Sequence, residues 1–215
     1  TPVESTHAAG LIAGNLAGWL KPGEPLDFYD LKHAVEKLLR GFGLVDVDFE
    51  PPAALTFLHP GVSAQIRTQQ GAHLGGALGA LGELHPAVAR KLGIETAAFY
   101  FEIEVAALAS ASGPLRTSAP PRFPAVSRDV SFWIDLATPA AALRAAFLSA
   151  KEPLLCDLAV LEDFRDPKYA PPGKKGVLWS MTYRAADRTL TDAEADEAHQ
   201  RVVKSLAERF SIQIR

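Results

Sequence analysis

Apolar side chains alternate with polar ones in three short segments of the second half of the chain, and a fourth segment is a mostly apolar run. In the segment RDVSFWID, the apolar residues Val130, Phe132 and Ile134 recur at every second position, which predicts a strand with one buried face over residues 128–135. Similar apolar runs predict three more strands, over residues 154–165, 176–184 and 211–215.

Two segments between these strands have helical spacing. Thr138 followed by Pro139 predicts the start of a helix that ends near Ala150. Thr191 and Glu194 form a capping-box pattern that predicts the start of a second helix. The apolar stripe of that second helix is Ala195, Ala198, Val202, Leu206 and Phe210. The resulting order, β-α-β-β-α-β, is the ferredoxin-like pattern, in which both helices cover one face of a four-stranded antiparallel sheet.

The other face of this predicted sheet is open, and the side chains on it follow from the alternation. The first strand contributes Ser131 and Trp133, and the others contribute Gly176, Ser180, Thr182, Arg184, Ser211, Gln213 and Arg215. The second strand is apolar on both faces up to Leu161, so the pattern does not orient it. An open, locally basic sheet with an aromatic ring is typical of a platform for single-stranded RNA. A merely solvated face, or one that packs on the first half, remains an alternative.

The first half of the chain predicts an α/β or α+β module with a mainly antiparallel sheet. A helix is expected over residues 28–40, with Leu31, Val35, Leu38 and Leu39 on one face and a glycine stop after it. We expect strands at residues 45–50, 63–68, 73–81 and 99–105, and a short helix at residues 86–92.

Composition divides the chain and excludes several classes of protein. The 215 residues are 48% apolar with a net charge of −3, which excludes a disordered chain and a globally basic nucleic-acid binder. The stretch 106–121 is small, polar and proline-rich, so we predict a module over residues 1–108, a linker over 109–121 and a domain over 122–215. The net charges of residues 1–118 and 119–215 are −4 and +1.

Targeting and redox signals are few. The uncharged stretch from Ser5 to Leu20 is too short for a membrane helix and lacks the basic region of a signal peptide, so an intracellular, cytoplasmic protein is expected. The single cysteine, Cys156, excludes a disulfide framework and is expected to be inert core. Because the sequence begins with Thr1 and not with methionine, we expect a fragment or a processed product.

Several remaining motifs are interpreted as structural. The glycine-rich run 71–82 lacks the motif of a phosphate-binding loop, and the glycines at 10, 14 and 18 lie in no membrane span, so both are assigned to close packing. His59 and His85 precede prolines and are assigned to turns or core. Asp46, Asp48 and Glu50 lack the rest of a calcium loop and are assigned to a solvated face. No metal site and no catalytic residue are predicted.

The residues of the second half resemble a known family. The start FPAVSRD at residues 123–129 and the segment RTLTDAE at residues 188–194 are similar to the ferredoxin-fold anticodon-binding domain that closes the β subunit of bacterial phenylalanyl-tRNA synthetases. Three segments of the first half, 27–39, 57–66 and 78–86, resemble the end of the catalytic-like module of that subunit, a degenerate class II synthetase fold.

The resemblance implies an anticodon site. By position it would consist of Glu162, Phe164, Gly176 and Arg215, although the family usually has Asp and Tyr where this chain has Glu162 and Phe164. The residues that could contact tRNA phosphates are Arg128, Lys174, Lys175, Arg184 and Arg188, each with a solvated-surface alternative.

The same resemblance implies a function and its partners. The chain would bind tRNA(Phe) and help to assemble an α2β2 phenylalanine–tRNA ligase, with the chemistry on the α subunit. ATP and magnesium are implied for the whole enzyme, and no cofactor is expected in this non-catalytic fragment. Two alternatives remain: a ferredoxin-like module that senses an amino acid, and an independent enzyme.

Overall fold

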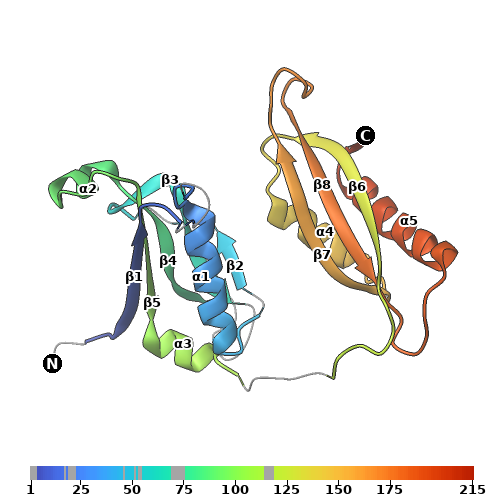
Figure 1. The fold of residues 1–215 in the computed structure, drawn as a ribbon, viewed down its shortest axis with the longest axis horizontal. Helices are drawn as coiled ribbons and strands as arrows, with labels where there is room; N and C mark the ends of the chain where they lie inside the picture. Colours follow the sequence, from blue (N-terminus) through green and yellow to red (C-terminus); the bar gives the residue numbers. More distant parts are fainter. Residues whose placement is uncertain are drawn as a thin grey trace. The chain divides into compact units, whose positions relative to one another are not determined.

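The chain folds as two compact units. The computed structural model describes residues 4–16, 18, 23–45, 47–50, 52, 55–68, 76–113 and 119–215. The units are Thr1–Thr117 and Ser118–Arg215 (Figure 1).

The first unit is built on a five-stranded antiparallel sheet with the order β1-β5-β4-β3-β2. Its strands are β1 (His7–Ala13), β2 (Val47–Glu50), β3 (Leu58–Thr68), β4 (Ala77–Leu84) and β5 (Ala98–Glu104). Its helices are α1 (Phe28–Gly41), α2 (Pro86–Lys91) and α3 (Val105–Ala111). The expected antiparallel α+β module is therefore confirmed.

Helix α1 forms where the apolar spacing predicts it. Leu31, Val35 and Leu39 are buried against the sheet, whereas the neighbouring Leu38 is only partly buried. Asp27 caps the first turn by accepting hydrogen bonds from the backbone amides of residues 29 and 30. Gly43 follows the helix with φ of +78°, a left-handed conformation that favours glycine.

The described part of the glycine-rich run, from residue 76 on, lies in and beside strand β4. A Cβ at Gly79 would overlap the backbone of Glu102, and one at Gly82 would lie 2.6 Å from the side chain of Ser63. These contacts confirm close packing as the role of both glycines. Residues 71–75 of the run lie outside the described residues.

Two details of the first unit bear on the sequence predictions. His85 accepts a hydrogen bond from the amide of Ala87 and thereby caps helix α2, which confirms its turn role. Helix α3 extends to Ala111 and buries Leu108, so the first residues of the linker predicted over 109–121 are helical instead. The small residues of this stretch resemble a linker in composition, yet they let the helix pack closely on the sheet.

The second unit has the predicted β-α-β-β-α-β order, and helices α4 and α5 lie on one face of its sheet (Figure 1). Its antiparallel strand order is β7-β8-β6-β9. The strands are β6 (Val126–Asp135), β7 (Leu155–Phe164), β8 (Lys174–Tyr183) and β9 (Gln213–Ile214), and the helices are α4 (Ala140–Ser149) and α5 (Asp192–Arg209). The expected ferredoxin-like class is confirmed.

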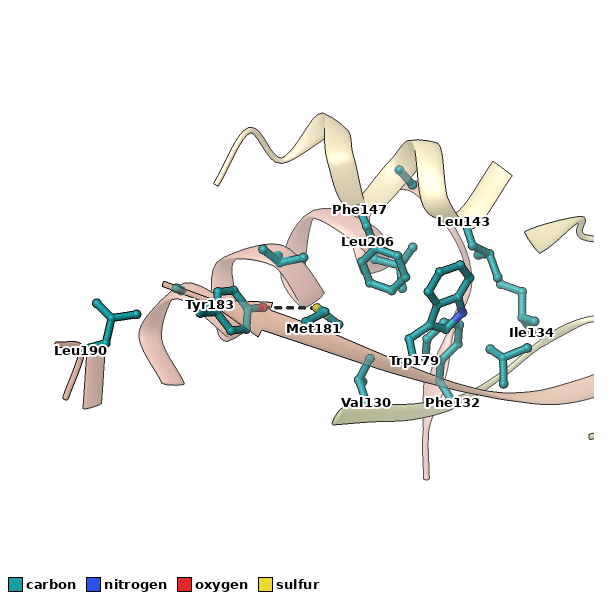
Figure 2. Close-up of a cluster of buried hydrophobic side chains, with 14 of the residues drawn as sticks. Val130, Phe132, Ile134, Leu143, Phe147, Trp179, Met181, Tyr183, Leu190 and Leu206 are labelled. Atoms are coloured by element: carbon teal, nitrogen blue, oxygen red, sulfur yellow. Dashed lines mark hydrogen bonds between the residues drawn. The ribbon is translucent and has the colours of Figure 1, made fainter. Parts of the chain in front are cut away.

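Aromatic rings fill the space between this sheet and its helices (Figure 2). The centroid of the Phe147 ring lies 5.2 Å from that of Trp179 and 6.5 Å from that of Phe132. Tyr183 is fully buried, and burial raises the pKa of its phenol. A core of this kind fixes which face of each strand points away from the helices.

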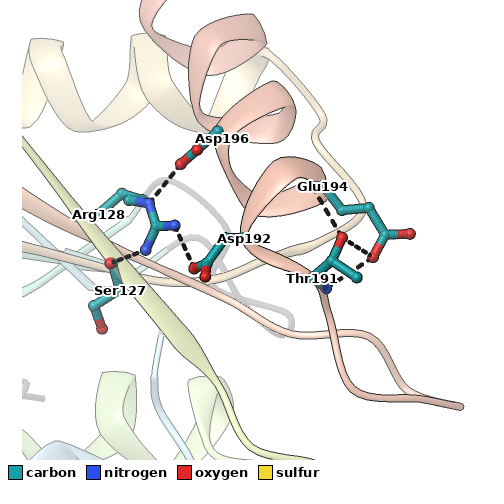
Figure 3. Close-up of polar contacts among 6 residues, drawn as sticks. All are labelled: Ser127, Arg128, Thr191, Asp192, Glu194 and Asp196. Carbon is teal, nitrogen blue, oxygen red and sulfur yellow. Dashed lines mark hydrogen bonds and ion pairs between the residues drawn. The ribbon is translucent and has the colours of Figure 1, made fainter.

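The two helix starts differ in how well the sequence predicts them. Thr191 and Glu194 form the predicted capping box, which Figure 3 shows at the start of α5. For α4 the prediction is off by one residue, because Pro139 and not Thr138 occupies the N-cap and no side chain caps the helix.

The prediction that Cys156 lies in the core is wrong. The residue is exposed on the edge strand β7, where its thiol contacts the carbonyl oxygen of Thr182. No helix among the described residues has the length and apolar character needed to cross a bilayer.

Candidate nucleic-acid interface

The face of the second sheet that the helices leave uncovered carries ordered rows of side chains. Strand β7 contains two bulges, at Cys156 and at Leu161, where one extra residue shifts the register. After the second bulge, Glu162 pairs with Leu178 and Phe164 pairs with Gly176, so both residues point to the open face. The two shifts cancel between Leu155 and Glu162, and the sequence left this strand without an orientation because it is apolar on both faces up to Leu161.

One row of this face brings three predicted features together. Phe164, Gly176 and Trp133 lie side by side on β7, β8 and β6. The ring centroids of Trp133 and Phe164 are 6.3 Å apart, with their planes tilted by 57°. Both rings are half-buried, so each keeps an accessible surface.

The guanidinium group of Arg215 covers this pair of rings. Its central carbon lies 4.4 Å from the centroid of the Trp133 ring and 5.8 Å from that of Phe164, within the range of cation–π attraction. The amide of Arg215 donates to the carbonyl oxygen of Ser131 at 2.8 Å, which anchors the end of the chain beside β6. Among the described residues no carboxylate forms an ion pair with Arg215.

We call Trp133, Phe164, Gly176 and Arg215 the ring–arginine cluster. Three of its members, Phe164, Gly176 and Arg215, are among the predicted site residues. The fourth predicted residue, Glu162, is exposed one row away, opposite Leu178. Trp133 was not predicted as a site residue, although the alternation of β6 already placed it on the open face.

The open face is not basic, contrary to the prediction. Its alternation gathers Lys174 and Arg215, with Arg184 one residue beyond β8, and the acids Asp129, Asp135, Asp157 and Glu162. The prediction failed for two reasons: β7, which could not be oriented from the sequence, contributes Asp157 and Glu162, and the predicted row left out Asp129 and Asp135 of β6. Planar groups, more than net charge, distinguish this surface.

Two of the five phosphate candidates lie on the helix side of the sheet. Arg128 donates to Asp192 and Asp196 of α5 (Figure 3), and these bonds raise the pKa of its guanidinium. Lys175 is buried, with 3% of its side chain exposed, and its ammonium lies 2.9 Å from Asp163. Neither side chain points to the open face.

The other three candidates are partly accessible. Lys174 shares the open face with Gly176 and forms an ion pair with Asp135 at 2.6 Å. Arg188 is paired with Glu194 beside the capping box of α5. The Nε atom of Arg184 is buried and has no hydrogen-bond partner among the described residues.

An ion pair supports the ring–arginine cluster from behind. Asp163 and Lys175 are the neighbours of Phe164 and Gly176 along the chain, and they point to the helix side. Hydrogen bonds from Arg165 and then from Lys175 lower the pKa of the Asp163 carboxyl to about 2. The carboxylate thus remains charged at neutral pH and holds the end of the β7–β8 hairpin.

Comparison with known proteins agrees with this architecture. Residues 1–105 match the family described as "Phenylalanyl tRNA synthetase beta chain CLM domain", and residues 121–215 match "Ferredoxin-fold anticodon binding domain". The chain belongs to the phenylalanyl-tRNA synthetase beta chain family.

Two relatives illustrate the extent of the match. The "Phenylalanine--tRNA ligase beta subunit" of Anaeromyxobacter dehalogenans is 40% identical over 215 residues, which cover 99% of this chain and 26% of that protein. The protein with the same name in Moorella thermoacetica is 36% identical over 220 residues, with coverages of 100% and 26%. The chain thus spans about a quarter of the length of these relatives.

The acidic residues of the first unit do not form a metal site among the described residues. Within the described ranges, no three His, Cys, Asp or Glu side chains gather as metal ligands do. Glu50 of the predicted acidic face pairs with Arg67, whereas Asp46 lies outside the described residues.

Proposed function

We propose that the second unit binds the anticodon loop of tRNA(Phe) on its helix-free face, within the β subunit of a cytoplasmic phenylalanine–tRNA ligase. The observation that supports this most strongly is the ring–arginine cluster, which lies on the open face of a domain that matches the anticodon-binding family. Unpaired bases can stack on rings whatever their sequence, and stacking contributes about 1–3 kcal/mol per base.

Base selection would come from Glu162. A carboxylate accepts hydrogen bonds only, so it favours bases that present N–H groups at that position. The Phe164 ring would stack on the same base, because Glu162 and Phe164 both point to the open face from the end of β7. The phenol hydroxyl that a tyrosine would offer at residue 164 is missing, so selection by a hydrogen bond from the ring is not available.

Phosphate contacts would be few. Arg184 and Lys174 are the candidates on the open-face side, and Lys174 would first have to leave Asp135. The first unit would serve assembly with the α subunit, and ATP and magnesium would act in the complete enzyme. The relatives named above are all ligase beta subunits, so the alternative of an amino-acid sensor gains no support from them.

Binding of an RNA hairpin to the 215-residue chain tests the proposal. The hairpin carries the phenylalanine anticodon, and a second hairpin differs only in the first anticodon base. We expect Phe164→Ala to weaken binding of the cognate hairpin about 5- to 150-fold, the equivalent of one lost base stack. Tyr29→Ala is the control, because it removes an even more exposed ring from α1 of the first unit.

Equal affinity for the two hairpins would contradict recognition. Equal binding by wild type, Phe164→Ala and Tyr29→Ala would contradict the placement of the site. Calorimetry with phenylalanine tests the alternative of an amino-acid sensor. If the chain binds phenylalanine and has no affinity for the RNA hairpin, the sensor function would replace our proposal.

A further inference from the structure

The ring–arginine cluster contains a tryptophan to which the resemblance assigned no role. Arg215 lies nearer to Trp133 than to Phe164, at 4.4 Å against 5.8 Å from guanidinium carbon to ring centroid. The guanidinium is therefore held chiefly by the indole. Arg215 is an exposed residue on the helix-free side of the sheet, so the outer face of its guanidinium is accessible.

We propose that Trp133 and Arg215 form a second base position beside Phe164, in which an unpaired base stacks on the outer face of the Arg215 guanidinium. The indole below holds that planar guanidinium in position on the sheet. The inference rests on the proposed function, and it adds a binding residue, Trp133, and an order of layers: indole, guanidinium, base. Arginine planes are known stacking surfaces for splayed-out bases, and a guanidinium attracts the π-face of each neighbour.

Two positions fit the geometry better than one. The centroids of Trp133 and Phe164 are 6.3 Å apart and their planes are tilted by 57°, so one flat base cannot lie parallel to both. The guanidinium lies closer to the indole than to the Phe164 ring, so Phe164 is the platform for the base that Glu162 selects. Neighbouring nucleotides of a loop would then use neighbouring platforms.

Gly176 acquires a specific role in this arrangement. A Cβ at this position would lie 2.9 Å from Nη1 of Arg215, closer than a Cβ tolerates, and 3.0 Å from Cζ3 of Trp133, a tight contact, so the guanidinium and the indole edge would have to shift. Each of these atoms belongs to a side chain and not to the backbone, so the substitution would displace the stack without opposing the fold. Gly176 is therefore a positioning residue that lets the indole and the guanidinium lie on the strand.

Single-nucleotide removal in the RNA gives the sharpest test. Hairpins that lack one base at each anticodon position in turn are titrated against the 215-residue chain and its variants. We expect each loss of a stacked base to weaken wild-type binding about 5- to 150-fold. That penalty should disappear at one and the same nucleotide position in three variants, Trp133→Leu, Gly176→Ala and Arg215→Ala. In Phe164→Ala it should disappear at a different nucleotide position.

Matched variants separate stacking from charge and from folding. Arg215→Lys keeps the positive charge but loses the plane, so it should preserve the salt dependence and lose the position-specific penalty. Arg144→Ala removes an exposed arginine from α4 on the helix side, and Gly41→Ala adds a Cβ where nothing lies within 4 Å. Both controls should bind as wild type does, and circular dichroism should show that all variants are folded.

The outcomes distinguish the inference from the proposed function. If Phe164→Ala removes a base penalty but Trp133→Leu and Gly176→Ala remove none, the second position is refuted and anticodon binding stands. If Arg215→Lys retains the full penalty at the shared position, planar stacking is refuted. If no missing base weakens wild-type binding, the proposed function itself fails.

Discussion

The ion pair between Asp163 and Lys175 should be the polar contact on which the second unit depends most. Asp163→Asn leaves the buried ammonium of Lys175 without a counter-charge, while the shape of the side chain hardly changes. Breaking a fully buried pair costs about 3–5 kcal/mol. Because the Asp163 side chain is 32% exposed, water partly compensates for the lost ion pair. We therefore expect the free energy of unfolding to fall by about 1–2 kcal/mol.

Urea unfolding at pH 7, followed by tryptophan fluorescence, measures this loss, because two of the three tryptophans, Trp133 and Trp179, belong to the second unit. Asp135→Asn is the matched control. It removes the same charge from an exposed pair with Lys174, and we expect a change of less than about 0.5 kcal/mol. Replacing both partners, as in Asp163→Leu with Lys175→Met, should restore stability to within about 1 kcal/mol of wild type.

The contribution of Asp163 to the stability of the fold should fall as the pH is lowered. The pKa of Asp163 is lowered from 3.8 to about 2 in the folded chain, so the carboxylate stabilises the fold at neutral pH and this contribution disappears as the pH falls through that interval. The difference between wild type and Asp163→Asn should therefore narrow below about pH 4. Equal losses in the two Asn variants, or a double variant no more stable than Asp163→Asn, would refute the reasoning.

Three further outcomes are expected. Thr191→Ala should destabilise the second unit by about 1 kcal/mol in thermal unfolding, because its hydroxyl caps α5, whereas Thr138→Ala, which removes no cap, should change little. Cys156 should react with a thiol reagent in the folded chain, and protection until denaturant is added would contradict its exposed position. Hairpin affinity should fall about sevenfold between 50 and 200 mM salt if about two phosphates are neutralised, and a loss of a hundredfold would indicate a basic site instead.

The elements of the second unit could be predicted because they depend on local rules. The alternation in β6 and β8 and the capping box at Thr191 each express a preference of a few neighbouring residues, and the structure confirms them. Local preference was less reliable where signals were weak. The alanine-rich stretch of α3 resembled a linker, and Thr138 and Pro139 offered adjacent starts for α4.

The candidate site required the tertiary structure wherever strand β7 was involved. Its residues are apolar on both faces up to Leu161, so the pattern assigns no face to Glu162 and Phe164, and only the pairing with β8 does. The bulge at Cys156 places Asp157 on the open face and leaves Cys156 on an exposed edge. Asp157 and Glu162, together with Asp129 and Asp135 of β6, make the predicted basic surface a mixed one.

The sequence by itself determined the order of the elements, the buried stripes of α1 and α5, and the open face to which Trp133, Gly176 and Arg215 point, because alternation and helical spacing are local. Only the tertiary structure decided which of these residues touch. The stacking of Arg215 on Trp133, the close approach of both side chains to Gly176, and the burial of Lys175 against Asp163 depend on strand register and on pairing between residues far apart in the chain.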